Sequence, residues 1–260
     1  MPSDTSSEIR ELVARRADLL DELRDGPREK RALVSSLPVS RSTVDRAVTE
    51  LTSFGLVAEV NGRVRSTAAG DLAASLHRDA VAGLDELLGL ASYLDGIDEC
   101  IRPQPCFFGA TDVVTEEDGS HAPAERLIEA FLDADRCRLV RGSIRPAFSA
   151  DVRERMLDGS LVVDATLCRD SVAFLRSYHE SDLARVLGTD HLTVREYPEP
   201  LHSGLYLFET DGEVSVSLTI HAETTDSVRA LLETDRLEAV AWAERALRAV
   251  RERSSPVESV

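Results

Sequence analysis

Residues 39–57 read VSRSTVDRAVTELTSFGLV, and the spacing within this stretch predicts an amphipathic helix that begins after Ser40. Val44, Val48 and Leu51 recur at i, i+4 and i+7, with an alanine beside them, so they form one apolar stripe for burial. Serine at the N-cap accepts a hydrogen bond from the first turn and favours a helix start here. The outer side of the first two turns is left to arginines and small polar residues.

The flanking residues complete a known order of elements. Helices are predicted over about 8–24 and 28–36, with a Gly-Pro pair separating them and a tight turn after the second. A glycine just past the third helix suits its left-handed end. Asn61 and Gly62 then predict a type I′ turn that closes a hairpin over 57–66. Helix, helix, turn, helix and hairpin is the order of a winged helix-turn-helix domain.

The charge of this segment supports DNA binding. Between Arg28 and Ser66 there are seven basic and four acidic residues, a net charge of +3 inside a chain of formal charge −17. A double-stranded DNA partner requires such a local reversal. The alternative is a helical hairpin whose arginine face is merely solvated. We expect base edges to meet Ser42, Thr43 and Arg46, and phosphates to meet Arg41, Arg63 and Arg65.

A long helix is predicted next, over 68–94, with apolar residues at intervals of three or four. This seam favours a homodimer through Leu76, Leu84 and Leu87, because a helix-turn-helix domain usually reads two half-sites. The alternative is that the helix packs on its own C-terminal domain.

Beyond this helix, strand and helix patterns alternate, which predicts an α/β domain around a mixed sheet and an α+β chain overall. The expected divisions are a DNA-binding domain at 1–67, a linking helix at 68–95, an effector domain at 96–254 and a flexible tail at 255–260. Strands are predicted at 106–114, 138–144, 161–167, 191–197, 205–208 and 214–220, and helices from about 123 and at 149–158, 169–187, 224–233 and 236–252.

The second domain lacks the motifs of common enzymes. Lys30 is the only lysine, so neither a phosphate-binding P-loop nor a His-x-Lys pair of the phospholipase D type is present after it. Three histidines, His179, His202 and His221, remain as a less favoured catalytic or metal trio. The four cysteines form no CxxC pair, so neither a metal nor another cofactor is expected.

A sensor of a small anionic ligand fits the second domain better. Loops at the carboxyl ends of strands form the usual pocket of α/β sheets, and arginine and hydroxyl groups suit an anion. The residues expected to bind it are Arg141, Ser143, Arg169 and His202.

The composition indicates the setting. A hydrophobic content of 43% is that of a globular protein, and neither a signal peptide nor a membrane-spanning run is evident, so a soluble, cytoplasmic protein is expected. With 47 acidic residues and one lysine, the chain is typical of a halophilic archaeon. A genome rich in G and C is the alternative, although it explains the scarcity of lysine and not the acidity.

Two groups of segments carry a family resemblance. RSTVDRAV at 41–48 with EL at 50–51 is similar to the recognition helix of archaeal, largely haloarchaeal, winged-helix regulators. The C-terminal domain of those proteins is named after a methanogenesis regulatory protein, and its end resembles SGLYLF at 203–208, DGE at 211–213, LLE at 231–233 and WAE at 242–244. The resemblance implies a dimeric transcription regulator with an effector domain of unassigned ligand. The cysteine-containing helix of ArsR-type metal sensors is missing, so metal sensing is not implied.

The function predicted is therefore that of a sequence-specific transcription regulator whose C-terminal domain senses a ligand or partner, and not that of an enzyme. Two alternatives stay open. One is an enzyme recruited to DNA by its helix-turn-helix domain, and the other is a docking protein that needs no small ligand.

Overall fold

The computed structural model describes residues 4–109, 111–142, 149–177, 185, 188–222 and 227–257. The chain divides into two compact units, Met1–Gly83 and Leu84–Val260, and each is described by itself. The division falls within a single long helix, α5 (Ala68–Leu94), which the sequence predicted over 68–94.

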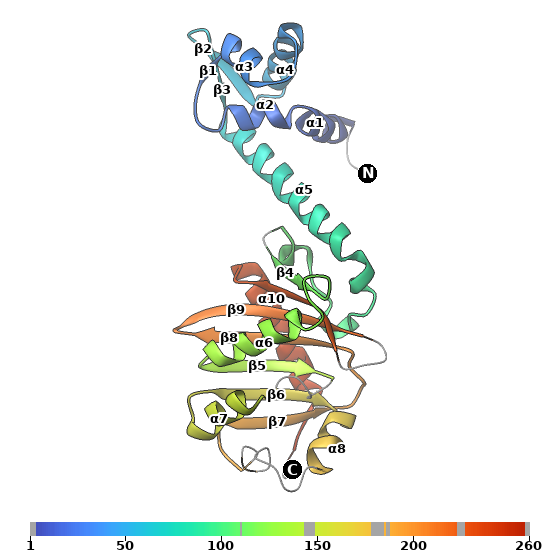
Figure 1. Cartoon of the computed structure of the whole chain (residues 1–260). Helices are drawn as coiled ribbons and strands as arrows, with labels where there is room; N and C mark the ends of the chain where they lie inside the picture. Colours follow the sequence, from blue (N-terminus) through green and yellow to red (C-terminus); the bar gives the residue numbers. More distant parts are fainter. Residues whose placement is uncertain are drawn as a thin grey trace. The chain divides into compact units, whose positions relative to one another are not determined.

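The first unit consists of helices packed against a small antiparallel sheet (Figure 1). Its helices before α5 are α1 (Asp4–Arg15), α2 (Ala17–Glu22), α3 (Lys30–Ser36) and α4 (Arg41–Ser53). Its strands are β1 (Arg28–Glu29), β2 (Val57–Val60) and β3 (Arg63–Ser66), in the order β1-β3-β2. The helices and the hairpin thus occur in the predicted sequence order, and β1 adds a strand that the sequence did not indicate.

The core of the first unit is the stripe predicted on α4. Val44, Val48 and Leu51 are at most 1% exposed and pack with leucines of the preceding helices. The single helix expected over 8–24 is wrong, because the chain breaks at Arg16, whose φ of −118° and ψ of 15° lie outside the helical region. The break turns α2, so that Leu19 and Leu20 enter the same core.

The start of α5 is tied to the end of α4. The hydroxyl of Thr67 donates to the carbonyl of Gly55 at 2.7 Å and accepts the N–H of Gly70 at 3.1 Å. Gly70 lies so close to Leu56 that a Cβ atom there would stand 2.0 Å from the Leu56 carbonyl oxygen. Only glycine allows this approach of the helix to the backbone before the hairpin.

The second unit is built on one mixed eight-stranded sheet in the order β11-β7-β6-β5-β8-β9-β10-β4. β5, β6 and β7 run parallel, and the remaining pairs are antiparallel. The strands are β4 (Asp112–Thr115), β5 (Arg136–Arg141), β6 (Val162–Cys168), β7 (Leu192–Tyr197), β8 (Ser203–Thr210), β9 (Glu213–His221), β10 (Val228–Thr234) and β11 (Ser255–Pro256). The helices are α6 (Ala122–Asp133), α7 (Ala150–Asp158), α8 (Arg169–Ser177) and α10 (Leu237–Glu252), with short 3-10 turns η1 (Glu99–Ile101) and η2 (Pro105–Phe107).

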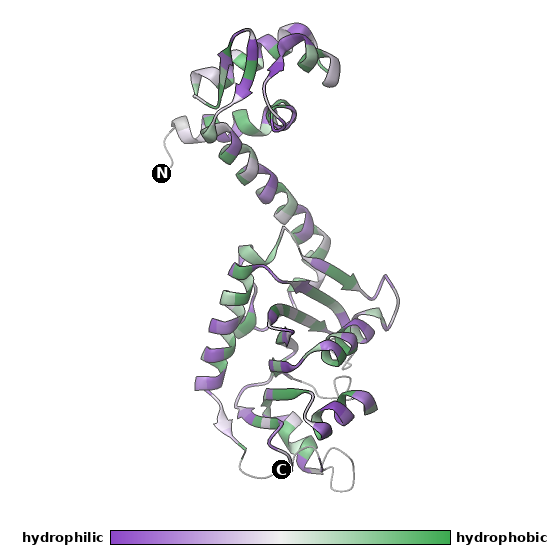
Figure 2. Cartoon of the chain, turned by 90° about the vertical axis from the view of Figure 1, so that its left-hand side faces the viewer, coloured by the Kyte–Doolittle hydropathy of each residue, from purple (hydrophilic) through white to green (hydrophobic). Residues whose placement is uncertain are grey.

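Helices cover both faces of this sheet (Figure 1). α6, α7 and α8 enclose one hydrophobic core, which contains Phe131, Tyr206 and Phe208. α10 and the two 3-10 turns enclose the other core, around Phe107 and Trp242. Figure 2 shows mostly hydrophobic strands between helices of mixed hydropathy, as expected when helices bury one side each on a central sheet.

Two predicted elements are wrong. The helix expected over 224–233 is instead strand β10, because Leu231 faces one core while Ala230 and Leu232 face the other. A strand buried on both faces reads as a continuous apolar run, which sequence periodicity does not distinguish from a helix. The strand expected over 106–114 begins only at Asp112, because the residues before it form η2, which buries Phe107.

The ordered chain also extends past the expected boundary at 254. Ser255 and Pro256 form β11 and pair with Glu196 and Arg195 of β7. The hairpin predicted around Asp211-Gly212 is confirmed, with φ values of 53° and 84° at these residues.

Candidate nucleic-acid interface and effector site

The start of α4 presents its polar residues to solvent. The hydroxyl of Ser40 accepts the N–H of Thr43 at 3.2 Å and lies 2.9 Å from the hydroxyls of Ser42 and Thr43. Because the buried stripe fixes the helix rotation, Arg41, Ser42 and Arg46 are exposed, and the side chain of Arg41 is 87% accessible. Thr43 is half-buried with its hydroxyl beside Ser40, so it is less available to a ligand than the sequence suggested.

The hairpin adds two more arginines. Asn61 and Gly62, with φ of 52° and 76°, make the tight turn, and the alternation after it buries Val64 while exposing Arg63 and Arg65. Within the described residues, Arg63, Arg65 and Arg46 of α4 form no ion pair and no side-chain hydrogen bond. The structure therefore leaves these guanidinium groups available to an external anion.

Acidic groups near these arginines are largely neutralised. The ammonium of Lys30 lies 2.7 Å from a carboxylate oxygen of Glu59 and 3.7 Å from one of Asp45, which is also 4.0 Å from Arg41. Sequence reasoning missed this role of Lys30, because its partners lie on α4 and on β2. The available signal in the sequence was that Lys30 is the only lysine among the basic residues.

A separate ion pair holds α4 in place. Arg16 donates from Nε and Nη2 to one oxygen of Glu50, at 3.1 and 2.9 Å. This hydrogen bonding by Arg16 lowers the pKa of Glu50 below its ordinary value, against the opposing effect of partial burial. The pair thus links α4 to Arg16, the residue that separates α1 from α2.

The segments that carry the predicted ligand-binding residues meet beside Gly142 at the carboxyl ends of β5 and β6, but the described side chains lie in different environments. Arg141 ends β5 and is fully buried, whereas Arg169 is largely exposed and pairs with Glu196 of β7 at 3.3 Å. His202 is exposed, and its backbone N–H donates to Asp98 at 2.8 Å. Ser143 lies outside the described residues. A clamp of Arg141 and Arg169 therefore gains no support, because the first guanidinium is buried whereas the second is exposed and paired with Glu196.

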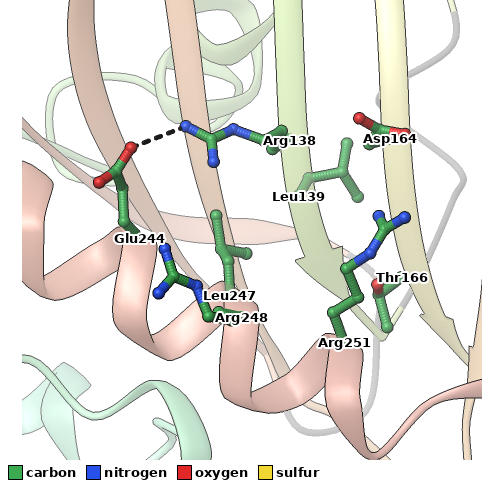
Figure 3. A pocket seen from close by; sticks show the side chains of 8 residues that line it. All are labelled: Arg138, Leu139, Asp164, Thr166, Glu244, Leu247, Arg248 and Arg251. Carbon is green, nitrogen blue, oxygen red and sulfur yellow. Dashed lines mark hydrogen bonds and ion pairs between the residues drawn. The ribbon is translucent and has the colours of Figure 1, made fainter.

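A groove that sequence reasoning missed lies between α10 and the strands β5 and β6 (Figure 3). It has a volume of about 300 Å³, and its charged residues are Arg138, Asp164, Glu244, Arg248 and Arg251. Arg138 is already paired with Glu244 at 3.0 Å. The available signal for this groove was the spacing of Arg248 and Arg251, which at i and i+3 share one side of α10. Asp164 is likewise paired with Arg136 at 3.7 Å, and the mixed charges of the groove identify no particular ligand.

Cysteine and metal chemistry receive no support from the geometry. Cys137 and Cys168 are buried, and burial raises the pKa of the Cys137 thiol well above its ordinary value. Throughout the described ranges, no group of three or more His, Cys, Asp and Glu side chains could hold a metal ion. His179 of the histidine trio lies outside these ranges.

The leucines expected in a dimer seam are accessible on α5. Leu76, Leu84 and Leu87 are 70%, 57% and 36% exposed, with Leu72 and Leu88 also exposed nearby. Large exposed apolar residues on one helix are uncommon unless something covers them. Despite these residues, none of the described helices is both long and apolar enough to cross a membrane.

Comparison with protein families finds one matching family model in each part of the chain. Residues 120–253 match the family model described as the middle domain of the methanogenesis regulatory protein FilR1, and residues 5–86 match the model of the HVO_A0261 N-terminal domain. A search of curated proteins finds no match.

Among solved structures, the chain is similar to TrmBL2, an archaeal chromatin protein, with 12% identity over 96% of this chain and 99% of that one and a TM-score of 0.44. It is also similar to NucT from Helicobacter pylori, with 12% identity over 57% and 99% of the two chains and a TM-score of 0.41. Nuc from Salmonella typhimurium, a phospholipase D family member, gives 14% identity over 58% and 99% and a TM-score of 0.40. Likenesses at this level carry no argument about function.

Proposed function

The chain belongs to the family defined by the middle domain of the methanogenesis regulatory protein FilR1, and from this premise we propose that it is a DNA-binding transcription regulator. The observation that carries the proposal is the set of exposed guanidinium groups of Arg46, Arg63 and Arg65, which lack ion-pair partners among the described residues. They lie in a segment of net charge +3 within a strongly acidic chain. Arginines left unpaired in such a setting suit a polyanion.

In this proposal α4 enters the major groove as a recognition helix. Ser42 and Arg46 reach base edges, and Thr43 assists from its half-buried position at the first turn. Arg41 contacts phosphate beside the N-terminus of α4, whose unpaired N–H groups also favour an anion. Arg63 and Arg65 contact phosphates from the hairpin, which acts as the wing.

The second unit serves as the effector domain in this proposal. Its binding of a small ligand or a partner changes the affinity of the first unit for DNA. The buried charge of Arg141 supports a small anion over a protein partner, because a side chain with no exposed surface offers nothing to a docking face. A homodimer through α5 places two reading helices on two half-sites.

The test measures DNA affinity of the full chain, first on sequences selected from a random duplex library. Arg46→Ala is expected to weaken the selected sequence by about 1–3 kcal/mol and to relax the base preference at one position of each half-site. Arg63→Ala is expected to weaken all sequences alike and to lower the slope of log affinity against log salt by about one.

The matched control is Arg245→Ala, which removes one exposed arginine from α10 and should leave both measurements unchanged. Equal loss on selected and random DNA for Arg46→Ala would contradict base reading by that residue. Absence of DNA binding by the full chain at low salt would overturn the proposal as a whole.

A further inference from the structure

Arg141, at the end of β5, is a charged residue in a fully buried position. Its side chain has no exposed surface, and none of its three guanidinium nitrogens has a hydrogen-bond partner among the residues that the structure describes. Arginine does not lose its proton in proteins, so burial cannot neutralise it as it neutralises a lysine. A buried charge without a partner is strongly unfavourable, and such groups in native proteins are normally paired.

The neighbouring groups do not supply the missing negative charge. The ring of Tyr206 lies with its centroid 5.9 Å from the Arg141 Cζ, at the outer limit of a cation–π contact, which offsets only part of the burial cost. Burial raises the pKa of the Tyr206 hydroxyl and of the Cys137 thiol, so both groups stay neutral. Across the described chain, no carboxylate lies within ion-pair distance of Arg141.

The surroundings of Arg141 form a row of polar groups across three adjacent strands. Arg141 of β5 is directly opposite Gly204 of β8, which is opposite Thr219 of β9. A Cβ atom on Gly204 would stand 2.8 Å from the Tyr206 hydroxyl and 2.6 Å from the Thr219 hydroxyl, so the glycine leaves the space that these two groups share. The hydroxyl of Tyr206 is itself buried and makes no hydrogen bond of good geometry among the described residues, although the nearby Thr219 side chain partly opposes the rise of its pKa.

The row also has an end toward solvent. The hydroxyl of Thr219 lies 3.0 Å from Nε2 of His221, and His221 is only half-buried whereas Arg141, Tyr206 and Thr219 are fully buried. The row therefore leads from an unpaired cation and an unpaired phenol toward the surface. It offers more donors than acceptors, as a binding site for an anion does.

We propose that this row is a binding site for a small oxyanion, a carboxylate or a phosphate, held by the Arg141 guanidinium and the Tyr206 hydroxyl. The planar fork of the guanidinium donates two parallel hydrogen bonds to the oxygens of either group. The Tyr206 hydroxyl, which with the Thr219 hydroxyl occupies the place that a side chain at Gly204 would fill, donates a third hydrogen bond. The inference deepens the proposed effector role by naming the chemical class of the ligand and the residues that hold it.

The experiment follows thermal unfolding of the full chain in potassium chloride at constant ionic strength, with inorganic phosphate or acetate replacing part of the chloride. At least one of the two is expected to raise the midpoint progressively with concentration, because a ligand that binds only the folded state stabilises it. Comparing the two series shows whether the site prefers a phosphate or a carboxylate. Absence of a rise with both oxyanions would overturn the proposal, since it would mean that the site accepts neither.

Three variants locate the binding. Arg141→Met is expected to abolish the rise, and Tyr206→Phe, which keeps the ring and removes one donor, is expected to raise the concentration needed by about tenfold. Arg169→Met removes an equally charged but exposed arginine and should leave the rise intact. If Arg141→Met does not fold, Tyr206→Phe and Arg169→Met still show whether the oxyanion binds at this row. A rise unaffected by Tyr206→Phe, or lost in Arg169→Met, would contradict the site.

This readout is separate from DNA binding. The unfolding midpoint reports on oxyanion binding by the second unit, while the affinities of the Arg46 and Arg63 variants report on the first. Failure of either proposal therefore leaves the other open to its own test.

Discussion

Arginine occupies three different environments in this chain, and sequence reasoning could not distinguish them. Arg16 is paired with Glu50. Among the residues that the structure describes, Arg46 is exposed without an ion pair and Arg141 is buried without a hydrogen-bond partner. The position of Arg46 on the outer side of a helix follows from periodicity, so its exposure could be predicted. The environments of Arg16 and Arg141 depend on residues distant in the sequence, which periodicity does not report.

The Arg16–Glu50 pair leads to a prediction of pH dependence. Because the pKa of Glu50 is lowered in the folded chain, its ionised form stabilises the fold above the unfolded pKa, and this stabilisation is lost as pH falls through the folded pKa. Glu50→Gln is expected to lower the free energy of unfolding by about 1 kcal/mol or less near neutral pH, since the pair is partly exposed. Urea denaturation of both chains from about pH 7 to about pH 4 should show the difference shrinking.

The control for this measurement is Glu11→Gln, which changes an exposed carboxylate of α1. It should leave the free energy of unfolding nearly unchanged over the same range. A difference between the wild-type chain and Glu50→Gln that grows as pH falls would contradict the assigned role of the pair.

At the scale of elements, sequence patterns predicted those segments that bury one side only. α4, the hairpin of β2 and β3, α5 and the β8–β9 hairpin all have clear periodicity or turn residues, and all occur where expected. β10 was missed because it is apolar on both faces. The two-residue strand β1 was missed because only its pairing with β3 defines it, and no local pattern reports such a contact. The exposure of the residues proposed to contact DNA could be predicted from the same periodicity as α4. The row around Arg141 could not, because it depends on the registers of three strands.

Two glycines of α5 give a matched prediction about the helix. A Cβ atom at Gly70 would stand 2.0 Å from the Leu56 carbonyl oxygen, whereas one at Gly89 meets nothing within 4 Å. Gly70→Ala is therefore expected to lower the free energy of unfolding of the first unit by about 1–3 kcal/mol or more, because the backbone has to shift. Gly89→Ala should instead raise stability by up to about 1 kcal/mol, since alanine favours a helix. Thermal unfolding of the two variants checks this difference. Equal effects of the two substitutions on stability would contradict the prediction.

At the scale of the whole molecule, charge and apolar surface are distributed unevenly. The chain has a formal charge of −17, yet residues 28–66 carry +3, so a DNA partner is favoured at one segment and repelled elsewhere. If the chain works in a high-salt interior, the counterion contribution to DNA binding is small, and contacts to base edges determine more of the affinity. High salt also strengthens the burial of apolar groups, which favours covering the exposed leucines of α5.

The last prediction concerns this assembly. Leu76, Leu84 and Leu87 lie within roughly 80° of the circumference of α5, so one partner helix can cover all three. Burying a leucine contributes about 1.5–3 kcal/mol, and placing glutamates there brings like charges together in an apolar seam. By light scattering in high salt, the wild-type chain is expected to be a dimer and the double variant Leu84→Glu and Leu87→Glu a monomer. The control pair Val81→Glu and Leu88→Glu changes exposed residues centred roughly 100° away on the same helix and should stay dimeric. A dimer unaltered by the first pair but dissociated by the second would move the interface to the adjacent face of α5, and would change the spacing expected between the two proposed half-sites.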